Sequence, residues 1–469
     1  MTFRVLAGVA LLVVSLHVSA LPSEVKEAIK RAQLPESSVS IWVQEVSADK
    51  PLISHNASAV MNPASVMKLL TTYAALDLLG PAFKWKTELY KKSELAADVL
   101  DGDLMLKGYG DPKLTIESFW RLLRNLRMRG VREIRGDLVL DRSYFSVPPH
   151  TAADFDGKPT RPYNVGPDPL LLNFHTVELQ FIPYEEANVV GIAAVPKPDQ
   201  LEIVNLLKLD REACDDWRER LDANVNDEGA SAIAVFRGAY SAECKEKSYS
   251  VAVLSSNQYV LGVFRQLWQE LGGTFKGGVR EAEWTPEWDL VAEHESITLG
   301  EAVRDINKFS NNVMARQLFL TIGAEAFGTN GSLELSRDAI HNWLANRNLK
   351  FPELVLENGA GLSRRERISA AHLGALLLDA WRSAVMPEFI ASMPLAGLDG
   401  TMQKRLQGSQ VVGQAHLKTG SLEGVRAIAG YVLDSKGRRI AVVCFVNHMN
   451  SANSKAVEDA LLVWLHQRP

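Results

Sequence analysis

The chain is organised around one stretch, Asn62-Pro63-Ala64-Ser65-Val66-Met67-Lys68-Leu69-Leu70. An asparagine followed by proline is typical of a helix start, and Gly80-Pro81 suits a helix end, so we predict a helix of about four turns. Residues three apart share a helix face, so Ser65 and Lys68 point the same way, and most other positions are apolar. The stretch therefore predicts a buried helix that places a hydroxyl beside an amine.

Lys68 is the only charged residue between Met61 and Leu76. Desolvation disfavours the charged form of a buried lysine, so this side chain needs a partner or a chemical role. A neutral lysine is able to deprotonate a serine, which makes Ser65 a candidate nucleophile and Lys68 its candidate base. Ser-x-x-Lys also occurs by chance beside a lysine that reaches toward solvent, so the motif alone is weak.

Length and composition indicate a soluble globular protein of two or three domains. The chain has 469 residues, of which 46% are hydrophobic and 23% charged. The net charge is only −5 and no long basic cluster is present. Nucleic acid is therefore excluded as an expected partner, and a small or peptidic ligand is favoured.

The first twenty residues have the pattern of a secretory signal. Arg4 precedes an apolar run over residues 5–16, and Val18-Ser19-Ala20 offers the small residues of a cleavage site. The run is short for a membrane span, so we expect a mature protein that begins near Leu21, in the periplasm, soluble or loosely membrane-associated. An uncleaved anchor is the alternative.

Export permits disulfides, and the chain has three cysteines. Cys214 and Cys244 flank one segment, whereas Cys444 lies in an apolar run over residues 440–446. We predict a bridge between the first two and a buried strand position for the third.

Both ends of the chain have the patterns of sheet. Residues 38–46 and 52–53 read as a hairpin, and residues 425–433 and 439–446 read as a second one. The helical pattern of residues 456–466 is expected to pack on this sheet; a membrane-surface anchor is the alternative. If the two ends form one sheet, the long middle of the chain is an insertion.

The middle of the chain shows two different sequence patterns. Gly-Asp-Leu turns at residues 102–104 and 136–138 each precede a strand-like run, around a helical pattern at 117–128. Short β-like runs fill residues 175–259. We therefore predict a signal peptide at 1–20, a catalytic domain at 21–87 and 289–469, an inserted domain at 88–174 and 256–288, and a nested β-rich domain at 175–255.

Two further motifs carry polar side chains. Ser310-Asn311-Asn312 lies between a helix opened by a capping box at Thr298 and a helix from Val313, where a hydroxyl can relay a proton and an amide can hold a peptide group. Lys418-Thr419-Gly420-Ser421 ends an edge strand, where ammonium and hydroxyl suit a carboxylate and glycine admits a ligand backbone. Each motif alone is also explained as a turn or as an exposed edge with a solubilising lysine.

In this order the three motifs form the set typical of penicillin-binding proteins and serine β-lactamases. Residues 62–81, 304–318, 357–369, 394–406 and 418–431 extend the match, and the chain resembles the D-alanyl-D-alanine carboxypeptidase/endopeptidase family, the class C penicillin-binding proteins of low molecular mass. The long insertion is similar to that family's two inserted domains. The resemblance implies an α+β fold with a β-lactamase/transpeptidase-like antiparallel sheet flanked by helices.

The resemblance also implies the role of each motif residue. Ser65 would attack the carbonyl between two D-alanines, Lys68 would take its proton, and Ser310 would pass a proton to the leaving amine. Substrate would be bound by Asn312, Lys418, Thr419, Gly420 and Ser421, with the backbone N–H groups of Ser65 and Ser421 as the oxyanion hole. No cofactor or metal is implied; the partners are peptidoglycan stem peptides, and β-lactam antibiotics as covalent inhibitors.

Two segments depart from the family pattern. Residues 357–364 replace the usual Asp-Gly-Ser-Gly, so the resemblance assigns this loop no role. The family also places an aspartate against the peptide stem, and Asp154 and Asp156 both fit that position.

Two other functions stay open. A serine β-lactamase would share the motifs, although no Glu-x-x-Leu-Asn element lies at a suitable place between Lys68 and Ser310. A non-catalytic wall-binding protein would use the inserted domains, and the intact motifs argue against it. His-Glu-x-x-His and Cys-x-x-Cys patterns are absent from the sequence, which disfavours a metal site.

Overall fold

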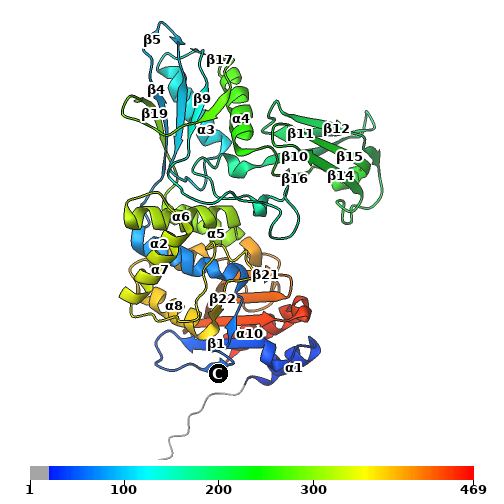
Figure 1. Cartoon of the computed structure of the whole chain (residues 1–469). Coiled ribbons are helices and arrows are strands. Elements are labelled where there is room, and N and C mark those ends of the chain that lie inside the picture. The colour runs from blue at the N-terminus through cyan, green and yellow to red at the C-terminus, as the bar shows by residue number, and fades with distance from the viewer. Residues whose placement is uncertain (1–20, 469) are drawn as a thin grey trace, which may run out of the picture.

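A five-stranded antiparallel sheet is built from both ends of the chain (Figure 1). The computed structural model describes residues 21–468, so the expected signal at residues 1–20 lies outside the described part. The strand order is β2-β1-β23-β22-β21. The strands are β1 (Val39–Glu45), β2 (Ile53–His55), β21 (Ala415–Leu422), β22 (Val425–Leu433) and β23 (Arg439–Asn447). Because β1 pairs with β23, the predicted union of the two chain ends is confirmed.

Helices cover both faces of this sheet. Successive strand residues point to opposite faces, so Ile41 and Val43 pack with one helix layer and Trp42 with the other. The first layer consists of α1 (Ser23–Arg31) and α10 (Lys455–Gln467). The second consists of α2 (Lys68–Leu79), α5 (Leu299–Phe309), α6 (Asn312–Phe327), α7 (Leu333–Asn346), α8 (Ala370–Arg382) and α9 (Met386–Ser392). This arrangement confirms the predicted α+β fold.

The apolar side of α10 is turned to the sheet. Leu461, Leu462 and Leu465 are fully buried there, so the helix packs on the sheet as predicted. No helix among residues 21–468 is long and apolar enough to cross a membrane.

The nucleophile helix begins more tightly than predicted. Its first turn is a 3-10 helix, η2 (Ala64–Met67), and the α-helix α2 starts only at Lys68. Such turns are common at helix starts. Ala64 has a left-handed backbone with φ +47°, and the Asn62 side chain accepts a hydrogen bond from its N–H at 2.8 Å. Asn62 thus holds the backbone at the start of the turn that carries Ser65.

The insertion rises from the helical layer as a second body (Figure 1). Its main sheet has the order β18-β9-β7-β4-β19, and a smaller one has the order β17-β8-β6-β5. The strands are β4 (Lys86–Lys91), β5 (Leu95–Ala96), β6 (Val99–Leu100), β7 (Leu104–Gly108), β8 (Glu133–Ile134), β9 (Leu138–Asp141), β17 (Thr274–Phe275), β18 (Val279–Glu281) and β19 (Asp289–Glu295). The helices are α3 (Ile116–Met128) and α4 (Ser256–Glu270). A two-stranded pair, β3 (Val60–Met61) with β20 (Ile368–Ser369), lies near the nucleophile turn.

The nested β-rich part projects sideways from the insertion (Figure 1). One sheet has the order β11-β10-β16, and in the other β12 and β13 pair with β15, which also pairs with β14. The strands are β10 (Val177–Tyr184), β11 (Val189–Val195), β12 (Leu201–Asn205), β13 (Lys208–Asp210), β14 (Leu221–Asp227), β15 (Ala232–Ser241) and β16 (Lys247–Val251). Cys214 and Cys244 form a disulfide, and Cys444 is free and buried in β23, so both cysteine predictions are confirmed.

Strand pairing bears on where the insertion begins and ends. β4 leads from the five-stranded sheet and its helices into the insertion, and β19 leads back. The two strands pair antiparallel. β4 crosses the expected boundary at 87/88, and β19 begins directly after the one at 288/289. One hydrophobic cluster joins both parts of the insertion. We propose that the division into a catalytic domain and a two-part insertion holds, with its boundaries at the outer ends of β4 and β19.

Candidate active site

Ser65 and Lys68 meet at the start of the nucleophile helix. The Lys68 side chain is fully buried, whereas Ser65 is the only partly exposed residue from 61 to 70. Lys68 Nζ lies 3.0 Å from Ser65 Oγ and 2.6 Å from Asn312 Oδ1, and it also donates to the carbonyl of Ala360. The structure thus brings the first two motifs together around one amine.

Burial lowers the pKa of Lys68 well below its ordinary value, and the positive charge of Lys418 lowers it further. Both effects favour the neutral form of the amine. A neutral amine has two N–H groups and one lone pair. Asn312 Oδ1 and the Ala360 carbonyl are acceptors only, so they occupy both N–H groups. The lone pair is left to face the Ser65 hydroxyl, which is the arrangement a base requires.

Lys418 and Ser310 form the opposite wall. Lys418 Nζ donates to Ser310 Oγ at 2.7 Å and to the Thr419 carbonyl at 2.8 Å. Ser310 has a left-handed backbone, with φ +57°, at the end of α5, and Asn312 opens α6. The sharp turn between the helices therefore aims Ser310 at Lys418 of the edge strand and Asn312 at Lys68 of α2. Thr419 Oγ1 lies 2.8 Å from the Thr401 hydroxyl, a partner that the sequence did not suggest.

The alternative reading of Lys418 as an exposed, solubilising lysine is wrong. β21 is an edge strand, as predicted, but Lys418 is fully buried, because the α5–α6 turn covers it. Burial lowers its pKa to about 7. The cation is held in place where a substrate carboxylate can replace water around it, which strengthens its attraction for an anion.

Two glycines allow the backbone to close around Ser65. A Cβ on Gly420 would lie 2.7 Å from the Pro63 carbonyl oxygen, and one on Gly361 would lie 2.0 Å from the Ala64 carbonyl oxygen. The close approach at Gly420 is thus to the nucleophile turn, whereas we expected it to serve a ligand. Ser421, the next residue of β21, is exposed.

The loop of residues 357–364 belongs to the site, although the resemblance assigned it no role. Besides the contact of Ala360 with Lys68, the Gly359 carbonyl accepts from Thr71 at 2.7 Å. Glu366, fully buried, holds this loop by accepting from the backbone N–H groups of Glu357 and Asn358 at 3.2 and 3.1 Å. Burial raises the pKa of the Glu366 carboxyl.

Arg316 is a second buried charge that sequence reasoning missed. It lies one turn after Asn312 on α6, burial lowers its pKa to about 10, and its Nη1 donates to the Val165 carbonyl at 2.5 Å. Arg316 is the only charged residue between Asn311 and Ala324. The signal that singled out Lys68, an isolated charge on an apolar helix, would have found it.

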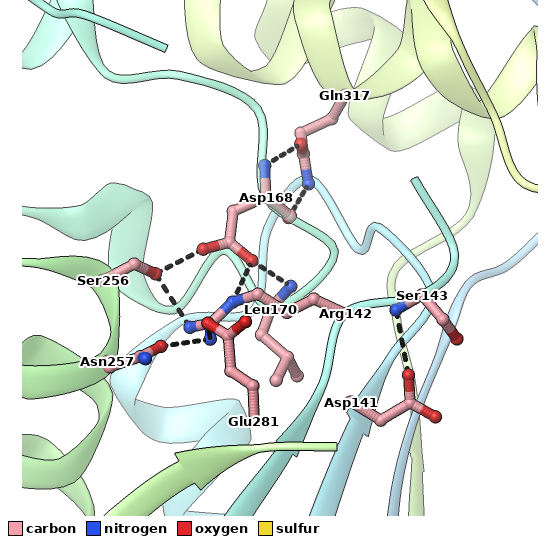
Figure 2. Close-up of polar contacts among 9 residues, drawn as sticks. All are labelled: Asp141, Arg142, Ser143, Asp168, Leu170, Ser256, Asn257, Glu281 and Gln317. Carbon is pink, nitrogen blue, oxygen red and sulfur yellow. Dashed lines mark hydrogen bonds and ion pairs between the residues drawn. The ribbon is translucent and has the colours of Figure 1, made fainter. Parts of the chain in front are cut away.

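The insertion is fastened to the same helix (Figure 2). Gln317 Nε2 donates to the Asp168 carbonyl at 2.7 Å, and its Oε1 accepts from the Asp168 N–H at 2.9 Å. The Asp168 carboxylate accepts from Arg142 at 2.8 Å and also from Ser256. Asp168 is therefore held from both sides, and the segment just before it is fixed against α6.

The two aspartates considered for the peptide stem differ in their surroundings. Asp156 accepts hydrogen bonds from Tyr163 and Asn164, each at 2.7 Å, whereas Asp154 is exposed. The Arg364 guanidinium lies 5.3 Å from the centre of the Phe155 ring between them, so this loop reaches across to the catalytic body. Which aspartate contacts a substrate stays a prediction.

The sheet, the helix layers and the three meeting motifs define a serine acyl-transfer enzyme of the penicillin-recognising class. The chain belongs to the D-Ala-D-Ala carboxypeptidase 3 (S13) family, whose model matches residues 21–468. The predicted family resemblance is thereby confirmed. Within residues 21–468 no group of three or more His, Cys, Asp or Glu side chains is placed to hold a metal ion.

Similar proteins agree with this membership. The D-alanyl-D-alanine carboxypeptidase DacB of Haemophilus influenzae is 26% identical over 418 residues, 88% of this chain and 86% of that protein. The D-alanyl-D-alanine carboxypeptidase of Actinomadura sp. (strain R39) is 28% identical over 453 residues, 92% of this chain and 83% of that protein. The crystal structure of penicillin-binding protein 4 from Haemophilus influenzae has a TM-score of 0.77 at 24% identity and covers 94% of this chain and 99% of that one, which shows the shared fold.

Proposed function

We propose that this protein is a serine-type D-alanyl-D-alanine carboxypeptidase that acts on peptidoglycan stem peptides through an acyl-enzyme on Ser65. Penicillin is its covalent inhibitor. The observation that carries the proposal is the buried Lys68 amine, 3.0 Å from Ser65 Oγ, with both of its N–H groups occupied by acceptors. Family membership over residues 21–468 supports the same substrate class.

The acylation step follows from this geometry. Ser65 Oγ attacks the carbonyl carbon of the penultimate D-alanine, and its proton moves to the Lys68 lone pair. The N–H groups of Ser65 and Ser421 hold the oxyanion, while Lys418 and Thr419 hold the terminal carboxylate. Ser310, hydrogen-bonded to Lys418, passes a proton to the leaving amine as the C–N bond breaks. Water then hydrolyses the ester and restores Ser65.

The site of action that we propose is the periplasm. The Cys214–Cys244 disulfide supports it, because such bonds persist in oxidising compartments. We also propose that the enzyme cuts D-alanyl cross-links, a DD-endopeptidase activity that uses the same acyl-enzyme with a larger leaving group.

The direct test is to incubate the purified protein with a stem pentapeptide that ends in D-Ala-D-Ala. We expect release of one D-alanine per peptide, and we expect penicillin to stop it. Rapid hydrolysis of penicillin with an untouched pentapeptide would indicate a β-lactamase. A protein that forms no acyl adduct and releases no D-alanine would be a wall-binding protein.

The rate of penicillin acylation is expected to fall as the pH is lowered through the pKa of Lys68, because the protonated amine accepts no proton. This pKa is depressed, so the neutral base persists to a lower pH than an ordinary lysine would allow. The positive charge of Arg316 contributes to the depression. Arg316→Gln should therefore raise the pKa and move the acid limb of the pH–rate profile to higher pH.

The exposed Arg237 provides the matched control. Arg237→Gln should leave the acid limb where it is. An acid limb at the same pH in Arg316→Gln and wild type would show that another group controls the step.

A further inference from the structure

We infer that a pocket beside Ser310 binds the departing part of a cross-linked substrate, and that it is built for an acidic peptide rather than for a single D-alanine. The pocket has a volume of about 380 Å³. Ser310 and Asn312 line it on the catalytic side, Phe309 lies at the turn between α5 and α6, and Arg161, Tyr163 and Phe174 line it from the insertion. The inference rests on the proposed acyl transfer to Ser65.

The position of Ser310 decides which part of the substrate lies there. Ser310 Oγ is the atom that delivers a proton to the leaving amine, and it contacts Lys418 at 2.7 Å. A chain attached to that amine continues from Ser310 toward the insertion, into the pocket. D-Alanine ends at its own carboxylate, which Lys418 and Thr419 hold, so a pentapeptide leaves the pocket empty.

The charge of the pocket identifies its ligand. Within residues 21–468 the Arg161 guanidinium forms no ion pair with a carboxylate, and its carbon lies 5.8 Å from the centre of the Tyr249 ring. The nearby Asp156 carboxylate is occupied by Tyr163 and Asn164. A half-buried, unpaired arginine is suited to a carboxylate, which it binds with two parallel hydrogen bonds. The ligand we infer is therefore the acidic stem peptide on the amine side of the cross-link.

The segment of the insertion that carries Arg161 is held against α6. Gln317 binds both backbone groups of Asp168 (Figure 2). Arg316 binds the Val165 carbonyl, so the chain just after Tyr163 is tied to α6. Asn312 lies at the start of that same helix. The catalytic turn and the arginine are thus parts of one fixed frame, which is what a binding site for a leaving group requires.

Phe174 is presented by an unusual turn. Asn173, Phe174 and His175 all have left-handed backbones, with φ of 46°, 55° and 53°. Such conformations persist only where the surroundings hold them. The Asn173 N–H donates to the Leu114 carbonyl at 2.7 Å, and a His175 ring nitrogen lies 3.0 Å from the Leu254 carbonyl oxygen. The turn places an aromatic ring of the insertion against the pocket that contains Ser310.

The bond changes are those of the proposed acyl transfer. The amide C–N bond between D-alanine and the amine of the second stem breaks, and the bond from Ser65 Oγ to the carbonyl carbon forms. The Ser65 proton goes to Lys68. The leaving amine gains a proton from Ser310, which takes one in turn from the Lys418 ammonium at 2.7 Å. The pocket changes only how well the second stem is held during this step.

The test compares two substrates with three variants. Arg161→Gln should lower kcat/KM for a cross-linked stem dimer by about tenfold or more, since an ionic hydrogen bond is lost. It should leave D-alanine release from a pentapeptide, and acylation by penicillin, within about twofold of wild type. Arg161→Lys should lie between, because the charge remains and the paired geometry is lost. Arg237→Gln, which changes an exposed arginine of the same insertion, should change neither substrate.

The outcomes separate this inference from the proposed function. A wild-type protein that reacts with neither penicillin nor pentapeptide would overturn the proposed function. A wild type that releases D-alanine but leaves the dimer uncut would overturn the endopeptidase activity and the pocket with it, while the carboxypeptidase activity stands. An Arg161→Gln variant with an unchanged ratio of the two activities would overturn the pocket alone. If Arg161→Gln loses acylation by penicillin, competitive inhibition of wild-type dimer cleavage by the free acidic stem decides: inhibition supports the pocket, and its absence overturns it.

Discussion

Replacing Ser65 by alanine is expected to abolish covalent labelling of the protein by penicillin. The Ser65 hydroxyl lies 3.0 Å from Lys68 Nζ, in the first turn of the nucleophile helix. Lys68→Ala should slow labelling by about 10²- to 10⁴-fold, the usual contribution of a general base. The label should map by peptide mass to the fragment that contains Ser65.

The Lys68 side chain is fully buried, so its replacement is expected to affect the stability of the fold as well as the reaction. Its removal leaves the acceptors of Asn312 and Ala360 without their donor, which costs stability. Thermal unfolding of Lys68→Ala and of the better-filling Lys68→Met should therefore be measured beside labelling. A folded Lys68 variant that is labelled at the wild-type rate would mean that another base acts. Persistent labelling of Ser65→Ala would place the nucleophile elsewhere.

Lys418→Ala is expected to slow acylation by penicillin by about a hundredfold or more, the typical loss when a preorganised charged donor is removed. The ammonium is buried at the end of β21 and hydrogen-bonded to Ser310, so it both attracts the substrate carboxylate and fixes the proton relay. The measurement is the second-order rate of acyl-enzyme formation with a chromogenic cephalosporin.

The matched control is Lys436→Ala, which removes an exposed lysine from the hairpin between β22 and β23 of the same sheet. It should leave acylation unchanged. A lysine on an edge strand is ordinarily exposed, and its replacement is then harmless to folding. Because Lys418 is buried, we also expect the thermal stability of the Lys418→Ala variant to change. A normal acylation rate in a folded Lys418→Ala would show that the carboxylate is held by other groups.

Local patterns were sufficient for much of the framework. The alternating runs at both chain ends predicted β1, β22 and β23, and Thr298 does form a capping box with Glu301. Strand alternation and helix capping depend on neighbouring residues, so they can be predicted from one segment of the sequence. The spacing of Ser65 and Lys68 is of the same kind, since three residues along a helix place two side chains together.

Contacts between residues far apart in the sequence could not be predicted from such local patterns. The Ala360 carbonyl that orients Lys68 lies 292 residues away in sequence, in a loop to which the motifs assigned no role. The isolated charge of Arg316 was visible, but its target, the Val165 carbonyl, was not. The alternative of an exposed Lys418 failed for the same reason, because a helical turn formed far upstream covers it.

The sequence by itself therefore determined which residues are able to react: a serine beside a lysine, a second serine with an asparagine, and a lysine on an edge strand. The tertiary structure alone decided their state. Burial and the second lysine set the proton affinity of Lys68, two acceptors direct its lone pair to Ser65, and the attached insertion places Arg161 beside Ser310. Proton affinity and desolvation depend on every group within a few ångströms, whatever its position in the chain, so they exist only once the chain has folded.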